Sequence, residues 1–220
     1  MISAKCFTQE WVEEKSVELG IHDKNLIEKV IHAFALLDLL AQLGCPFHFT
    51  GVPYFKNGKS SSLEIIKQLY DIGRLFERVD DLSITARVFK SIGEIELGYR
   101  DLPLDVSIIY DDIRNTALNL SLRGLVDQEK FALLQDGINR FKPFVYTTPY
   151  YIENAIVDAS KAAYLATLLK FGVMRVEKYS GDLSSLPEMT TVSNWFNKLN
   201  KLKKLNPEAY FYWVKAFTVA

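Results

Sequence analysis

The chain has 220 residues, enough for one large domain or two small ones, and 49% of them are hydrophobic. This composition supports a packed core and excludes a disordered or fibrous protein. Because 26 Lys and Arg stand against 27 Asp and Glu, the net charge is −1, so any contact with nucleic acid or anionic lipid must be local.

Low glycine and proline contents and a hydrophobic period near 3.6 residues predict an all-α fold, an array of about eight helices. In chain order, the expected helices span residues 8–19, 23–43, 63–79, 83–99, 105–123, 127–141, 152–171, 191–205 and 208–217. The residues expected to cap or end these helices are Thr8, Gly20, Asp23, Gly44, Ser83, Gly124, Asp127 and Gly172.

The loop-like stretch from residue 45 to residue 62 is the longest in the chain and contains Pro46, Gly51, Pro53 and three consecutive serines. We expect it to be a junction between an N-terminal helical lobe, residues 1–44, and a C-terminal helical array, residues 63–220. The lobe should pack on the array, so that residues 1–220 form a single helical domain.

Cysteine content and hydropathy indicate the cellular compartment in which the protein is expected. Cys6 and Cys45 form no CxxC pair, which excludes a disulfide scaffold and a zinc cluster. The first ten residues lack the apolar run of a signal peptide, and the most apolar stretch, residues 33–43, is too short to cross a bilayer. We therefore expect a cytoplasmic protein with no membrane partner.

Residues 63–76, with the sequence LEIIKQLYDIGRLF, resemble the late Lys…Asp motif of the AbiEii-type nucleotidyltransferase toxins. Residues 28–44, 116–124, 134–138 and 158–164 are similar to other helical parts of that family, so the resemblance runs from about residue 23 to residue 171. It implies a bacterial abortive-infection or toxin–antitoxin protein with an antitoxin as partner. The remnant of the family motif would be Lys67, Tyr70, Asp71 and Arg74.

The chain departs from this family where the catalytic core should begin. Residues 44–49 resemble the entrance to that core, but residues 50–55, TGVPYF, follow in place of a Gly-Gly-Thr/Ser turn and an Asp-x-Asp strand. The resemblance therefore implies a shortened protein with no catalytic residue, metal or cofactor, acting as a protein- or RNA-binding module. Lys67 and Asp71, four residues apart on one helix face, would then serve as a structural ion pair or a helix-to-helix hydrogen bond.

The alternative is an active nucleotidyltransferase in which Asp105 and Asp111 replace the missing motif and hold Mg²⁺ and a nucleoside triphosphate. In that case the resemblance implies that Lys67 and Asp71 position the substrate or act as a base.

A lysine-rich segment near the C-terminus is a candidate RNA contact, formed by Lys198, Lys201, Lys203 and Lys204. Nearby aromatic residues, Trp195, Tyr210, Tyr212 and Trp213, could stack on bases. The alternative is an amphipathic packing helix, because Leu199, Leu202 and Leu205 alternate with the lysines at helical spacing.

Loss of the core should uncover apolar side chains on the helices that carry residues 26–43 and 67–76. Either the N-terminal lobe collapses onto the array, or two copies bury these surfaces against each other. We favour the homodimer, because helices linked by a long loop exchange between copies at little cost.

Overall fold

The computed structural model describes residues 8–19, 61–99, 101–145, 149–184, 186 and 194–219. The chain divides into two compact units, Met1–His48 and Phe49–Ala220, and each is described by itself. The predicted helix over residues 23–43 and nearly all of the predicted junction lie outside the described residues. The packing of the N-terminal lobe on the array therefore stays a prediction.

The first unit contains helix α1, Gln9–Leu19. Thr8 caps it as predicted, because the Thr8 Oγ1 accepts a hydrogen bond from the backbone N–H of Trp11 at 3.3 Å.

The second unit is all-α in its described part, which confirms the predicted fold class. Its one β-type pairing among these residues is an isolated bridge between Asp81 and Arg175. Eight α-helices and a short 3₁₀ helix, η2 (Lys142–Phe144), make up the described part of this unit. The α-helices are α3 (Ser61–Phe76), α4 (Ser83–Gly98), α5 (Ser107–Ser121), α6 (Gln128–Phe141), α7 (Ile152–Phe171), α8 (Asn194–Asn200), α9 (Leu202–Leu205) and α10 (Pro207–Val219).

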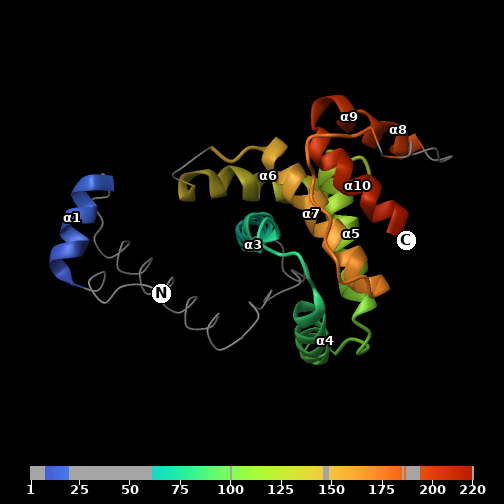
Figure 1. Cartoon of the computed structure of the whole chain (residues 1–220), viewed down its shortest axis with the longest axis horizontal. Helices are drawn as coiled ribbons and strands as arrows, with labels where there is room; N and C mark the ends of the chain where they lie inside the picture. Colours follow the sequence, from blue (N-terminus) through green and yellow to red (C-terminus); the bar gives the residue numbers. More distant parts are fainter. Residues whose placement is uncertain are drawn as a thin grey trace. The chain divides into compact units, whose positions relative to one another are not determined.

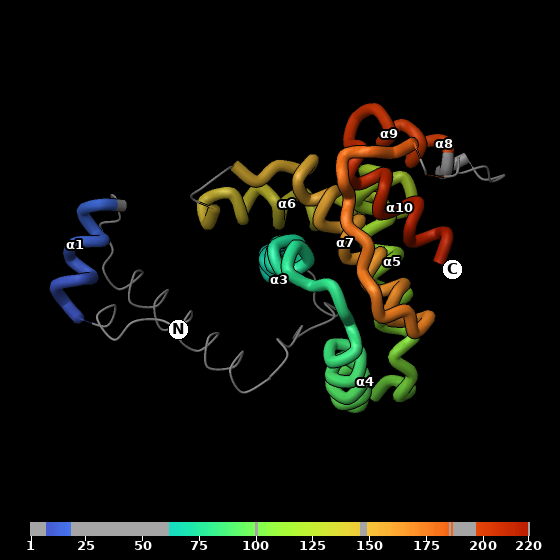
Figure 2. The backbone as a smooth tube through the Cα atoms, in the orientation of Figure 1, coloured from blue at the N-terminus to red at the C-terminus, as the bar shows by residue number. Residues whose placement is uncertain are grey.

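Helix α7 is the central element of this unit. It packs against α3 and α6 on one side and against α5 and α10 on the other (Figures 1 and 2). Its bounds match the prediction, and Gly172 ends it in the left-handed conformation at φ 70°. Because α7 is covered on several sides, twelve of its twenty residues are buried.

The core around α7 is rich in aromatic side chains. Phe76, Tyr164, Tyr212 and Trp213 are among its largest fully buried members. The Trp213 indole Nε1–H donates to the Ser121 hydroxyl at 3.0 Å, so the one polar atom of this ring is satisfied inside the core.

The connection after α7 is held by hydrogen bonds on both sides. Leu82 N–H donates to the Met174 carbonyl at 2.8 Å, and Val176 N–H donates to the Asp80 carbonyl at 3.0 Å. Further along, Tyr179 N–H donates to the Tyr212 hydroxyl at 3.2 Å. The connection therefore joins the turn between α3 and α4 to α10.

Several helix boundaries differ from the prediction. Helix α3 begins at Ser61 rather than Leu63. Ser83 is the first residue of α4 and not its cap: the N-cap position is Leu82, and the Ser83 N–H donates to Asp81 Oδ1 at 2.8 Å. The predicted helix over residues 191–205 is interrupted at Lys201, which separates α8 from α9. Among the described helices, none combines the length and apolar character that crossing a bilayer requires.

Two glycines allow α3 to approach its neighbours closely. A Cβ on Gly73 would lie 2.0 Å from Oδ1 of Asp158 on α7, and a Cβ on Gly137 of α6 would lie 2.4 Å from the Ser62 carbonyl oxygen. Any larger side chain at these positions would force the helices apart.

We predict that Gly73→Ala lowers the free energy of unfolding by about 2–4 kcal/mol, because the new methyl group collides with a buried carboxyl. Chemical denaturation followed by circular dichroism measures the change. Gly98→Ala is the matched control, since its Cβ would meet Leu104 at an ordinary 3.7 Å. This control should stay within about 1 kcal/mol of the wild type. Equal stabilities of the two variants would contradict the close approach.

Candidate functional site

The four residues of the family-like motif lie on α3 and divide into a solvent-facing and a packed group. Lys67 is half-buried, pairs with Glu64 at 2.8 Å, and its Nζ lies 4.9 Å from the centre of the Phe144 ring. Asp71 lies on the exposed side of α3, yet partial burial raises the pKa of its carboxyl, an effect that the charge of Lys67 opposes. Lys67 therefore forms its ion pair with Glu64, not with Asp71.

Tyr70 belongs to an aromatic cluster between α3, α6 and the segment before α7. Its ring centre lies 5.2 Å from that of Phe141 and 5.4 Å from that of Tyr150. The guanidinium of Arg74 lies 5.2 Å from the centre of the Tyr70 ring. Tyr70 thus supports the packing of α3 and the placement of Arg74.

Arg74 makes a helix-to-helix contact with a buried carboxyl group. Its Nη2 lies 3.4 Å from Oδ1 of Asp158, a residue that is 0% exposed. The Tyr150 hydroxyl donates to the other oxygen of Asp158 at 2.9 Å. Burial raises the pKa of Asp158 to about 6, although the hydrogen bond from Tyr150 and the charges of Arg74 and Lys161 act in the opposite direction.

Lys161, one helical turn after Asp158 on α7, is a second buried charge. Its Nζ pairs with Glu77 at 2.6 Å and with Glu208 at 2.7 Å, and it lies over the Phe76 and Tyr212 rings at 5.6 and 5.7 Å. Burial alone would lower the pKa of Lys161, but the hydrogen bonds to Glu208 and Glu77 outweigh burial and leave it raised. The ammonium is therefore a charged link between α7, the end of α3 and α10.

The two aspartates of the enzymatic alternative have partners of their own. Asp105 accepts from the Ser107 N–H at 2.9 Å at the start of α5, which lowers its pKa. Asp111 accepts two hydrogen bonds from Lys170 of α7, at 2.6 and 2.8 Å. Across the described ranges, no three His, Cys, Asp or Glu side chains are grouped so that they could hold a metal ion.

The apolar surface predicted on residues 67–76 is not exposed, and this part of the prediction is wrong. Phe76 is buried, together with Ile65 and Ile66 at the start of α3. The residues of α3 that face solvent are polar, namely Glu64, Asp71 and Arg74. Helices α6 and α7 cover the apolar side of α3, so no exposed apolar surface remains there.

The four lysines near the C-terminus are all exposed, and within the described chain none of them forms an ion pair. We call Lys198, Lys201, Lys203 and Lys204 the lysine face. Leu199 and Leu202 between them are buried at 0% and 7% exposure, as an amphipathic packing helix requires. Leu205 is 78% exposed, because the interruption at Lys201 turns α9 away from the direction of α8.

The aromatic residues predicted to stack on RNA bases do not face the lysine face. Tyr210, Tyr212 and Trp213 are 1–2% exposed and belong to the core, and the side chain of Trp195 lies outside the described part. The stacking part of the prediction is therefore wrong for these three residues, because α10 uses its rings to pack against α7.

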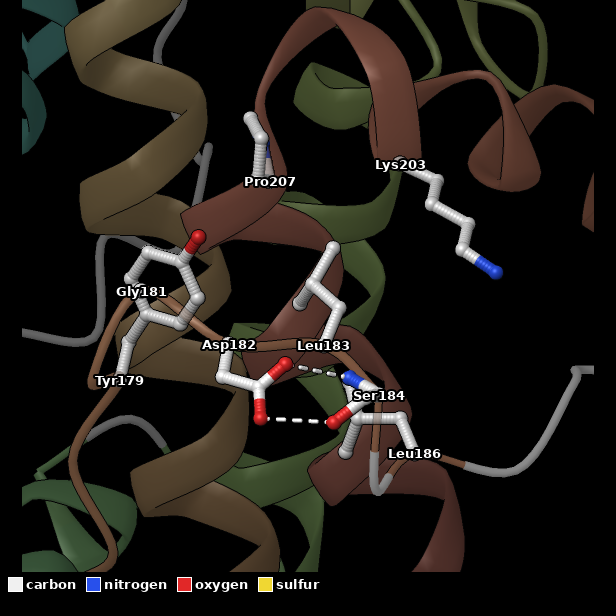
Figure 3. A pocket seen from close by; sticks show the side chains of 8 residues that line it. All are labelled: Tyr179, Gly181, Asp182, Leu183, Ser184, Leu186, Lys203 and Pro207. Atoms are coloured by element: carbon white, nitrogen blue, oxygen red, sulfur yellow. Dashed lines mark hydrogen bonds between the residues drawn. The ribbon is translucent and has the colours of Figure 1, made fainter.

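A pocket of about 530 Å³ lies beside Lys203 (Figure 3). Its polar groups are used within their own loop, because Asp182 accepts from the Ser184 N–H at 2.8 Å and from its hydroxyl at 2.6 Å. The lining residues are Tyr179, Gly181, Asp182, Leu183, Ser184, Leu186, Lys203 and Pro207. Polar and apolar groups line this pocket about equally, and they include no group of convergent catalytic side chains.

The sequence predicted no role for Asp158, Lys161 or Lys170. In the structure they are the partners of Arg74, of Glu77 and Glu208, and of Asp111, in that order. A signal for the first two was present, because Asp158 and Lys161 are the charged residues in an otherwise apolar and small-residue run from residue 155 to residue 169. A charge in such a helix is expected to find a buried partner.

Comparisons of the chain with protein-family models, with curated proteins and with solved structures found no match. Membership of the AbiEii-type family therefore stays a prediction that depends on the resemblance of the residues quoted for it.

The raised pKa of Asp158 gives stability a definite pH dependence. Between pH 4 and pH 6 the unfolded chain loses this proton while the folded chain keeps it, so the contribution of Asp158 to stability falls as pH rises. We compare the free energy of unfolding of Asp158→Asn with that of the wild type. We predict that the difference changes by about 2 kcal/mol in favour of the variant from pH 4 to pH 7.

Urea denaturation of both proteins at each pH measures this difference, in which the other titrating groups cancel. A difference that is the same at both pH values would show that Asp158 is ionised throughout.

Proposed function

We propose that the chain is a non-enzymatic binding module that contacts the phosphate backbone of RNA through the lysine face. The setting is the toxin–antitoxin or phage-defence context that the family resemblance implies. The observation that supports this proposal is the lysine face itself: four exposed ammonium groups within seven residues, without an acidic partner in the described part of the chain.

The lysine face suits phosphate because its backbone is anchored while its charges are free to bind. Leu199 and Leu202 hold α8 and α9 to the unit, and the neighbouring acidic residues are occupied, Glu208 by Lys161 and Glu153 by Arg123 at 3.0 Å. An ammonium group binds phosphate as a point charge and carries no sequence information. Since the rings of α10 are in the core, we expect binding that depends on salt and tolerates any sequence.

We predict that the chain binds a fluorescent oligouridine at low salt, measured by fluorescence anisotropy. A plot of the logarithm of the affinity against the logarithm of the salt concentration should have a negative slope. The slope should be no steeper than about −3, the value for four phosphate contacts on a single strand. Lys204→Glu should weaken binding several-fold, because it removes one contact and adds a repulsive charge.

Lys90→Glu is the matched control for this experiment, because Lys90 is an exposed residue of α4 and the charge change is the same. Binding unchanged by Lys90→Glu supports the lysine face as the contact. An equal loss in both variants, or no binding even at low salt, would contradict the RNA proposal and favour an acidic protein, such as the expected antitoxin, as the partner.

The enzymatic alternative has a separate test. Incubation with labelled nucleoside triphosphates, Mg²⁺ or Mn²⁺ and total tRNA should give no transfer of label, because no three His, Cys, Asp or Glu side chains of the described residues are grouped to hold the metal that this chemistry needs. Metal-dependent labelling that Asp71→Ala abolishes would overturn the non-enzymatic proposal. Asp71 suits this test because it lies on the exposed side of α3, where the substitution leaves the packing unchanged.

A further inference from the structure

Helix α4 carries an apolar stripe on the side that faces away from the rest of the unit. Its opposite side packs on α5: a Cβ on Gly93 would lie 3.0 Å from Val106 and Ile109, and Phe89 stacks on Tyr110 with ring centres 5.1 Å apart. Ile84 and Ile95 are 55% and 53% exposed nevertheless. Figure 1 shows α4 at one end of the unit.

Three exposed apolar residues, Ile84, Ile95 and Tyr99, and the half-buried Val88 lie along one side of α4. At about 100° per residue, Ile84, Val88, Ile95 and Tyr99 fall within about 60° of one another around the helix axis. We call these four residues the α4 stripe. Gly93 and Leu97, the buried residues of α4, lie on the other side of the helix. An exposed apolar line of this length on a helix is typical of a surface that binds a partner.

We propose that the α4 stripe is a homodimer interface in which α4 pairs antiparallel with α4 of a second copy. A two-fold interface must be self-complementary, since each residue meets its symmetry-related position. The stripe meets this requirement: Ile84 and Tyr99 are equally far from a centre between Ser91 and Ile92, and so are Val88 and Ile95. Each aliphatic side chain near one end therefore faces an apolar side chain from the other end of the second copy.

The charges beside the stripe are also self-complementary. Arg87 and Glu94 lie on the same flank and on opposite sides of this centre. Their distances from it differ by two residues, about 3 Å along the helix, which a long arginine side chain can span. In an antiparallel pair each flank meets itself, so Arg87 faces Glu94 of the second copy, and the contact occurs twice. Within the described chain neither residue forms an ion pair. The small side chain of Ser91 near the centre allows the two backbones to approach closely.

The size of the surface sets the expected affinity. The sixteen residues of α4 extend over about 24 Å, and one helix pair buries less than the ~800 Å² per partner of a standard interface. Leu104 lies beside Gly98 and is 64% exposed, so it extends the apolar area at the end of the helix. We therefore expect a reversible dimer with a dissociation constant in the micromolar range, formed independently of the lysine face on α8 and α9.

Sedimentation equilibrium of the full chain over a wide concentration range tests the proposal. The expected result is a mass that rises from 25.2 kDa toward twice this value as concentration increases. Arg87→Glu should raise the dissociation constant at least tenfold, because each Arg–Glu contact becomes a repulsive pair. The exchange Arg87→Glu with Glu94→Arg should restore it to within about threefold of the wild type, since both contacts form again with reversed charges.

Lys90→Glu is the matched control, because it makes the same charge change on the same helix away from the stripe, and it should leave the dissociation constant unchanged. Ile95→Glu should abolish the dimer, and circular dichroism should show the helix content of every variant retained. A wild type that stays monomeric, a double exchange that fails to restore the dimer, or a dimer insensitive to Ile95→Glu would each overturn the α4 interface.

Discussion

The arrangement of the second unit depends on the burial of two opposite charges one turn apart on α7. Asp158 contacts Tyr150 and Arg74 and leaves no room for a side chain at Gly73, while Lys161 pairs with Glu77 and Glu208 and lies over two aromatic rings. A buried charge that loses its partner costs several kcal/mol, so α3 and α10 must lie where their side chains reach α7. The two charges therefore add a requirement to apolar packing: α3 must bring Arg74 to Asp158, and α10 must bring Glu208 to Lys161.

Local chemistry explains why many helix ends were predictable. Thr8 and Asp127 cap α1 and α6 through their own side chains, and Gly172 ends α7 because only a residue that tolerates positive φ fits there. These signals lie within a few residues of the boundary that they determine. The break at Lys201 was not predictable in this way, because leucines at positions 199, 202 and 205 suit a continuous helix and only the position of α10 shows that the chain turns.

The partners of the residues in the family-like motif were not predictable from the sequence. Arg74 and Asp158 are separated by 84 positions, and no local pattern connects them. The role of Tyr210, Tyr212 and Trp213 was hidden for the same reason, because their partners in the core are far away in the sequence. The sequence places these rings beside lysines, which is typical of a surface, but in the structure they complete the core. Of the two helices expected to expose an apolar surface, only α3 lies among the described residues, and it does not expose one, because α6 and α7 cover its apolar side.

The position of α10 has a consequence for the order in which this unit is made. Helix α10 follows α3 to α9, yet it supplies Glu208 to Lys161, the Tyr212 hydroxyl to Tyr179 and the Trp213 ring to the core. While the chain is being synthesised, α3 to α7 emerge first. Lys161 can then pair with Glu77 but not yet with Glu208, and the apolar side of α7 lacks the rings of α10. The unit therefore reaches its closed form only after α10 is complete, and until then its central helix is exposed to chaperones and to other chains.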